Sequence, residues 1–180
     1  MPTWNSRLPK RTPRPKRRIF PTVGRSPHLI DVRLHKVSLD LINGKAAWPF
    51  LLYGPAGGGK SYASLCLCDF ARTSSYWTLE EACDAVMGGG DEKGRLLGEA
   101  RVRDLFVIDE VGIRDRAGDL ERSTLKRILD EREQNQGRRT IAISNRTPSE
   151  LAAVYDDPII SRLACGTRFK LDETDRRMTL

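Results

Sequence analysis

One ten-residue run carries the most specific chemistry of this 180-residue chain. It reads LYGPAGGGKS from position 52 to position 61 and fits the pattern G-x-x-x-x-G-K-[ST]. Glycines let the backbone wrap around an anion, so that successive N–H groups point at phosphate oxygens. A helix that begins at the end of the loop adds its positive N-terminal dipole. The run therefore predicts a phosphate-binding loop, or P-loop, and the alternative is a glycine-rich turn that binds no ligand.

The residues of this loop have separate expected tasks. We expect ATP to contact eight consecutive residues, which are Gly54, Pro55, Ala56, Gly57, Gly58, Gly59, Lys60 and Ser61. Lys60 should reach the β- and γ-phosphates, and the Ser61 hydroxyl should ligate Mg²⁺. The motif requires a strand before the loop and a helix after it. Residues 50–53 are short and apolar and residues 61–71 have a helical pattern, so the required context is predicted as well.

A second chemical feature is the run LFVIDE, from position 105 to position 110. Four apolar residues followed by two acids fit a strand that is buried on both faces and whose carboxyl end meets a ligand. In this Walker B pattern, Asp109 should belong to the Mg²⁺ shell through a water molecule. Glu110 should orient and deprotonate the attacking water. Many strands end in acids, but this one lies 48 residues after a complete P-loop, which makes the pattern specific.

Periodicity and end signals predict the elements that position these residues. Strands are expected at 50–53, 74–77, 105–108, 140–145 and 168–171, and helices at 29–42, 61–71, 79–87, 91–103, 120–136, 148–155 and 158–163. Capping boxes at 78–81 and 147–150 mark two of the helix starts. The charged run 130–133 is interpreted as a solvated helix face. Together these elements predict an α/β fold in which helices flank a parallel sheet.

The charge of the chain is unevenly distributed. Of its 31 basic residues, eight lie within residues 1–28, where no acidic residue occurs, and the remainder of the chain is close to neutral. Six prolines in the same segment oppose a packed element, so we expect a disordered basic arm. The arm would dock on nucleic acid phosphates or on an acidic partner surface, or would merely aid solubility. Residues 29–180 are then expected to form one domain.

Composition also bounds the setting of the protein. No apolar run approaches the ~20 residues of a membrane span, which predicts a soluble protein without a membrane partner. The four cysteines form no C-x-x-C pair and no cluster with a histidine. This favours reduced thiols in a cytosolic protein and argues against a zinc site.

Two later segments resemble parts of AAA+ ATPases. The run from Ile143 to Asn145 resembles the sensor-one strand, whose asparagine helps to position the hydrolytic water. The run from Pro158 to Leu163 resembles the segment that carries the arginine finger. The order and spacing of the motifs over residues 45–171 resemble the DnaC/IstB branch, which comprises bacterial and phage helicase loaders and transposition helper ATPases. The resemblance implies an AAA+ fold in which Asn145 and Arg162 join Glu110 as catalytic residues, with Arg162 acting in trans.

The same resemblance implies a function. It predicts an ATPase with ATP and Mg²⁺ as cofactors, which assembles head to tail into a homo-oligomer and loads a replicative helicase during DNA replication. Single-stranded DNA would be a further partner, in the cytoplasm of a bacterial or phage-infected cell. Basic candidates for DNA contact are Lys93, Arg95, Arg101, Arg103, Arg114 and Arg116. No helical lid is expected after the fifth strand, and Arg176 and Arg177 are weaker candidates for a nucleotide sensor.

Three alternatives stay open at this point. A transposition target-selection ATPase of the same fold would bind duplex DNA and grow filaments. A P-loop small-molecule kinase would need an arginine-rich lid, and none is obvious between Gly112 and Thr140. A non-hydrolysing nucleotide-dependent adaptor would need Asp109 but not Glu110.

Overall fold

A parallel five-stranded sheet forms the centre of the protein. The computed structural model describes residues 32–134 and 138–171. The strands are β1 (Phe50–Tyr53), β2 (Ser74–Thr78), β3 (Leu105–Asp109), β4 (Arg139–Ser144) and β5 (Thr167–Lys170). They lie in the order β2-β3-β4-β1-β5, and every neighbouring pair is parallel. The predicted sheet is therefore confirmed, and the observed strand bounds differ from the predicted ones by a residue or two.

Helices connect the strands. Within the described ranges they are α1 (Val32–Ile42), α2 (Lys60–Phe70), α3 (Leu79–Gly88), α4 (Gly90–Val102), α5 (Asp119–Glu133), α6 (Pro148–Val154) and α7 (Asp157–Ala164). Both predicted capping boxes are formed, because the Thr78 and Thr147 side chains accept from the amides of Glu81 and Glu150 and the two glutamates accept in return. These local signals explain why α3 and α6 begin where they do.

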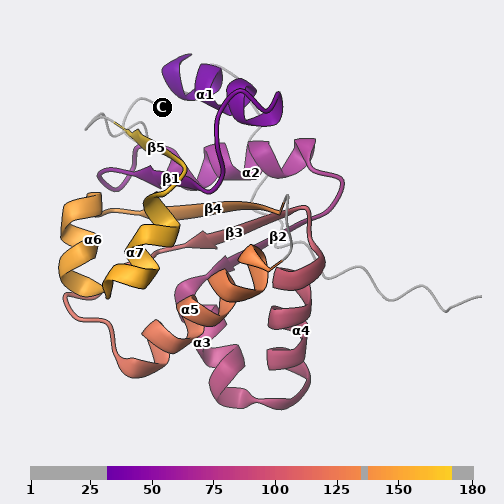
Figure 1. Ribbon diagram of the computed structural model, residues 1–180, viewed down its shortest axis with the longest axis vertical. Coiled ribbons are helices and arrows are strands. Elements are labelled where there is room, and N and C mark those ends of the chain that lie inside the picture. Colours follow the sequence, from indigo (N-terminus) through magenta and orange to yellow (C-terminus); the bar gives the residue numbers. More distant parts are fainter. Residues whose placement is uncertain (1–31, 135–137, 172–180) are drawn as a thin grey trace, which may run out of the picture.

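The helices cover both faces of the sheet, which gives three layers. Alternation along β1 sends Leu51 to one face and Phe50 and Leu52 to the other. The face of Phe50 packs against α1 and α2, while the face of Leu51 packs against α3, α4, α5, α6 and α7. Figure 1 shows α1 and α2 above the sheet and α3, α4 and α5 below it. All five residues of β3 are buried, as expected for a strand in the middle of a parallel sheet.

The topology places a ligand-binding edge at the end of β1. The helix that follows β1 lies on one face of the sheet, and the helices that follow β2, β3 and β4 lie on the other. The chain therefore changes face beside β1, and open α/β sheets bind ligands at such a point, outside the carboxyl ends of the strands. The P-loop is the segment that leaves β1 at this position.

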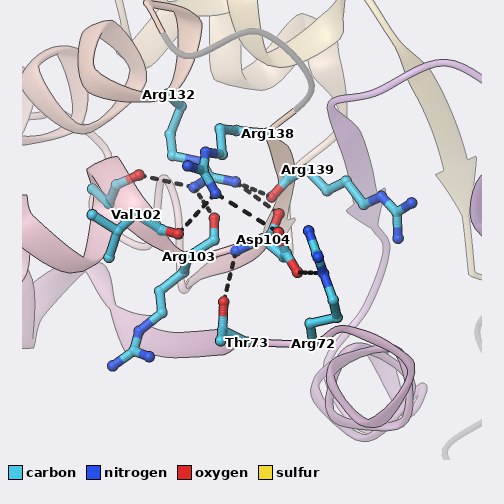
Figure 2. A network of polar contacts seen from close by, with 9 residues as sticks. Arg72, Thr73, Val102, Arg103, Asp104, Arg132, Arg138 and Arg139 are labelled. Carbon is cyan, nitrogen blue, oxygen red and sulfur yellow. Dashed lines mark hydrogen bonds and ion pairs between the residues drawn. The ribbon is translucent and has the colours of Figure 1, made fainter.

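A buried arginine links the helices to the amino-terminal ends of the strands, opposite the P-loop (Figure 2). Arg132 of α5 is only 4% exposed. Its guanidinium donates to five acceptors, which are Ala100 O, Arg103 O, Asp104 O, Arg139 O and Thr140 Oγ1. Burial lowers the pKa of Arg132 to about 10, so the side chain stays charged near neutral pH. The guanidinium thereby joins α4 and α5 to the residues just before β3 and to the first residues of β4.

The prediction that the run 130–133 forms a solvated face is wrong for Arg132, which is buried. Arg132 points into the protein, and its neighbours in the run form ion pairs. Glu131 pairs with Arg101 of α4, and Asp130 and Glu133 pair with Arg162 of α7. A run of mixed charges looks alike in sequence whether its members face water or pair with other residues.

Several expectations concern features away from the sheet. None of the helices in residues 32–134 and 138–171 is both long and apolar enough to cross a membrane. Cysteines 66, 68, 83 and 165 are free. The basic arm of residues 1–28 and the residues Arg176 and Arg177 lie outside the described part of the chain.

Candidate nucleotide-binding site

Three neighbouring strand ends bring the predicted site residues together. The P-loop leaves β1, Asp109 ends β3, and Asn145 directly follows β4, which lies between those two strands. Backbone hydrogen bonds join the three ends, because Gly54 N donates to Ser144 O at 3.2 Å and Val111 N donates to Ile143 O at 2.9 Å. The P-loop, the Walker B acids and Asn145 therefore lie together at the carboxyl ends of the strands.

The P-loop has a backbone that requires glycine at both of its ends. Gly54 has a φ of 134°, and a Cβ there would lie 2.4 Å from the carbonyl oxygen of Leu171. Gly59 has a φ of 85° and is the N-cap of α2. The loop thus turns directly into the first residue of α2, Lys60, so that the N-terminal end of this helix faces the loop.

Lys60 occupies the inside of the loop. Its side chain is folded back, and Nζ donates to Gly54 O at 2.7 Å and to Pro55 O at 2.6 Å. The residue is 7% exposed. A buried ammonium group attracts an anion strongly, because little water competes for its charge. A bound phosphate would take over the role that these carbonyl oxygens have in the structure.

Ser61 and Asp109 are in direct contact. Ser61 Oγ donates to Asp109 Oδ2 at 2.7 Å, and the Glu110 amide donates to Asp109 Oδ1 at 2.7 Å. Among the described residues, no cluster of three or more His, Cys, Asp or Glu side chains could hold a metal ion. The oxygen donors of Ser61 and Asp109 nevertheless suit Mg²⁺, which in nucleotide sites uses one or two protein ligands together with phosphates and water. The donor set thus fits the expected cofactor.

A tyrosine that the sequence analysis did not identify also belongs to this contact. The Tyr76 hydroxyl of β2 donates to the same oxygen of Asp109 as Ser61 does. Burial, followed by the hydrogen bond to Asp109, raises the pKa of Tyr76 far above its usual range. Only the strand order, with β2 beside β3, reveals this proximity.

Glu110 has an unusual backbone conformation. Its φ of 63° is the single positive value among the described residues other than glycine. Such strained conformations occur disproportionately at active sites. Partial loss of hydration raises the pKa of its carboxyl, and the negative charges of Asp109, Glu80 and Glu81 raise this pKa further. A carboxylate with a raised pKa is a better proton acceptor, as a general base requires.

The loop after Glu110 is fixed to the end of β4 and to α5. The Tyr155 hydroxyl accepts from the Gly112 amide at 3.0 Å and donates to the buried carboxylate of Glu121. Arg146, next to Asn145, donates to Gly112 O and to Asp115 Oδ1, each at 2.6 Å. These contacts link the Walker B segment to the segment that carries Asn145. The sequence offers no local signal for them.

Arg162 lies apart from these residues. It is near the end of α7, just before β5 begins, and so lies at the amino-terminal ends of the strands, opposite the P-loop. The length of a four-residue strand, ~13 Å, separates the two ends. Within its own chain Arg162 contacts Asp130 Oδ1 and Glu133 Oε2, both at 2.8 Å. The structure therefore does not bring Arg162 to the P-loop of the same chain.

These features define the class of the fold as a P-loop NTPase of the AAA+ type, a parallel sheet flanked by helices. No protein-family model and no curated protein sequence matches the chain. Solved structures do match. The DnaC helicase loader is 15% identical, with 79% of this chain and 92% of that chain covered at a TM-score of 0.65. DnaI is 15% identical, with 81% and 89% covered and a TM-score of 0.65.

Replication initiators match equally well. The initiator DnaA bound to AMPPCP and single-stranded DNA is 18% identical, with 79% of this chain and 46% of that chain covered at a TM-score of 0.66. The chain thus spans about half the length of the first replication initiators that it matches. At these identities the similarity establishes the fold, and it confirms at that level the resemblance to DnaC-like AAA+ ATPases.

Proposed function

We propose that this chain is an ATP-hydrolysing AAA+ module that acts on DNA in replication as the loader of a replicative helicase in the cytoplasm. The observation that supports hydrolysis most directly is the contact between Ser61 of the P-loop and Asp109 of the Walker B strand, with Glu110 beside it. The helicase assignment is supported by the fold shared with the DnaC helicase loader and DnaI.

The residues of the site divide the work on the nucleotide. The P-loop amides, the N-terminus of α2 and Lys60 bind the phosphates, and Lys60 exchanges the carbonyls of Gly54 and Pro55 for phosphate oxygens. Ser61 and Asp109 would hold Mg²⁺, which neutralises charge on the phosphates when bound. Glu110 accepts a proton from the attacking water, and Asn145 orients that water from the neighbouring strand end.

Arg162 completes the site of a neighbouring subunit in this proposal. Its position at the edge opposite its own P-loop suits an arginine that acts across a head-to-tail interface. A guanidinium placed there would stabilise negative charge developing on the γ-phosphate of the neighbour's ATP. The ion pairs with Asp130 and Glu133 would have to open for this contact.

Two variants test the proposed ATPase. Lys60→Ala removes the cation that faces the β- and γ-phosphates and should abolish ATP binding. Glu110→Gln keeps the metal-binding oxygens of Ser61 and Asp109 but loses the base, so it should bind ATP without turnover. Equilibrium ATP binding and phosphate release would be measured for both. Near-normal phosphate release by Glu110→Gln would overturn the catalytic assignment.

The proposed DNA and helicase partners need a separate test. Deleting residues 1–28 removes eight positive charges, so binding to single-stranded DNA should weaken and depend less steeply on salt. Affinity purification from the native cell should recover a replicative helicase. Recovery of a transposase together with filament growth on duplex DNA would favour the transposition helper ATPase instead. If the protein without residues 1–28 binds DNA as tightly as the full chain at every salt concentration, the arm is passive.

A further inference from the structure

Tyr76 is placed to act on Asp109 by the register of two neighbouring strands. In the β2–β3 pair, Tyr76 lies opposite Val107, and Thr78 lies opposite Asp109. Side chains two residues apart share a face, so Tyr76, Val107 and Asp109 point to the same side of the sheet. Tyr76 and Val107 pack in the hydrophobic cluster that includes Ala63 of α2. The ring thus lies between β2 and α2, and its hydroxyl emerges where α2 begins.

The Asp109 carboxylate receives donors from three different segments. Its Oδ2 accepts from Ser61 Oγ and from the Tyr76 hydroxyl, and its Oδ1 accepts from the Glu110 amide. Asp109 itself is 7% exposed. A carboxylate with three donors has little rotational freedom, because each rotation breaks at least one charge-assisted hydrogen bond. The orientation of the carboxylate is therefore set by its surroundings before any ligand arrives.

We propose that Tyr76 is a positioning residue for the metal-dependent binding of nucleotide, because its hydroxyl holds Asp109 in the orientation that the metal shell requires. The inference rests on the proposed function. Ser61 can ligate Mg²⁺ through a lone pair while its O–H donates to Asp109, and Tyr76 supplies a second donor to the same oxygen from a side chain that is not an expected metal ligand. Tyr76 stays in place on Oδ2, because its ring is fixed by packing against the sheet and α2.

The chemistry of the tyrosine side chain suits this role. Its phenolic O–H group is a hydrogen-bond donor, and Asp109 Oδ2 accepts from it. A phenylalanine at this position would keep the ring in its packing site and remove only the donor.

The test compares nucleotide affinity with and without Mg²⁺. Wild type and Tyr76→Phe would be titrated with a fluorescent, non-hydrolysable ATP analogue, once in excess Mg²⁺ and once in EDTA. Asp109 acts on the nucleotide through the metal, so the Kd in EDTA should be equal for both proteins within twofold. In Mg²⁺, the Kd of Tyr76→Phe should rise about tenfold, which corresponds to about 1.4 kcal/mol.

Trp77→Phe is the matched control. Trp77 is the next residue of β2 and is also a buried aromatic residue that donates to a carboxylate, that of Glu99, but it packs on the face of the sheet opposite to Tyr76. This control should lower the melting temperature but leave the ratio of the Kd values in EDTA and in Mg²⁺ as in wild type. If the ratio of the Kd in EDTA to the Kd in Mg²⁺ falls in both variants, the effect is a general one of weakened packing and the proposal is overturned.

A double-mutant cycle with Asp109→Asn gives a second measurement. If Tyr76 acts through Asp109, adding Tyr76→Phe to Asp109→Asn should change the Kd in Mg²⁺ by less than twofold. Three outcomes would overturn the role of Tyr76. Tyr76→Phe could lose affinity equally in Mg²⁺ and in EDTA, or it could fail to fold. Tyr76→Phe could also weaken binding a full tenfold when it is added to Asp109→Asn. A wild-type protein that binds no nucleotide under either condition would instead overturn the proposed function.

Discussion

Replacing Arg132 with methionine should be among the most damaging single changes in the domain. Methionine keeps much of the side-chain length but removes every donor. The guanidinium lies within the polar network of Figure 2, where it donates to four backbone carbonyls and to the Thr140 hydroxyl, and Arg132 is almost fully buried. An acceptor left buried without a partner costs about 1–3 kcal/mol, and Arg132→Met leaves five acceptors without their charged donor, several of them at the partly hydrated ends of the strands.

We expect Arg132→Met to lower the free energy of unfolding by about 3–5 kcal/mol. The lower end applies if water reaches the freed carbonyls, which lie at the edge of the sheet. This loss is a large fraction of the ~5–15 kcal/mol that stabilises a typical domain. For a domain of this size it corresponds to a fall in the melting temperature of roughly 6–20 °C. Arg132→Lys keeps the charge but lacks the planar fork, so its loss should be intermediate.

Urea unfolding followed by circular dichroism measures these changes, with Arg101→Met as the matched control. Arg101 lies on the neighbouring α4 and makes two hydrogen bonds, both to Glu131; its own side chain is 61% exposed, and that of Glu131 is 15% exposed. An ion pair with one exposed partner contributes about 1 kcal/mol at most, so the control should lose much less stability than Arg132→Met. An Arg132→Met variant as stable as Arg101→Met would refute the assignment of Arg132 as a buried structural link.

Two further predictions concern the proposed ATPase. Glu110 must be deprotonated to act as a base, and its pKa is raised. On acidification, turnover should therefore begin to fall at a higher pH than it would with an ordinary glutamate. Glu80→Gln removes one of the charges that raise this pKa, so it should move the acidic limb of the pH–rate profile to lower pH, and an unmoved limb would contradict the assignment. Neutralising Asp130 and Glu133 to Asn and Gln should raise ATP turnover at low protein concentration roughly two- to fivefold, since partly exposed ion pairs hold Arg162 by about 1 kcal/mol at most. Lower or unchanged turnover would show that these pairs do not restrain Arg162.

Much of the fold could be predicted because its signals are local. The P-loop, the apolar run before Asp109 and the two capping boxes each depend on residues close in sequence, and each element formed at its expected place. Even the common edge of the site residues could be predicted, since parallel strands present all their carboxyl ends together. The resemblance to DnaC-like ATPases added the likeness in fold that the solved structures confirm.

The contacts that the sequence did not reveal depend on strand order and register. Tyr76 meets Asp109 because β2 lies beside β3 with Thr78 opposite Asp109, and no pattern within SSYWT encodes that pairing. Arg132 appears in sequence as one charge in a charged run, and its burial follows from how α5 packs over the beginnings of β3 and β4. The ion pairs of Arg162 likewise join helices that are distant along the chain.

Mixing two inactive variants tests the central claim, an AAA+ ATPase that is active only as a head-to-tail assembly. Arg162→Ala should bind ATP nearly normally but lose hydrolysis, because arginine fingers contribute roughly 10³–10⁵-fold to turnover. Lys60→Ala lacks a working pocket but keeps its arginine. A mixture contains interfaces that pair an intact pocket with an intact arginine, so ATP hydrolysis should return, and wild-type specific activity should rise with protein concentration. A mixture that stays inactive, together with wild-type activity that is independent of concentration, would contradict the account and indicate a self-sufficient monomeric enzyme.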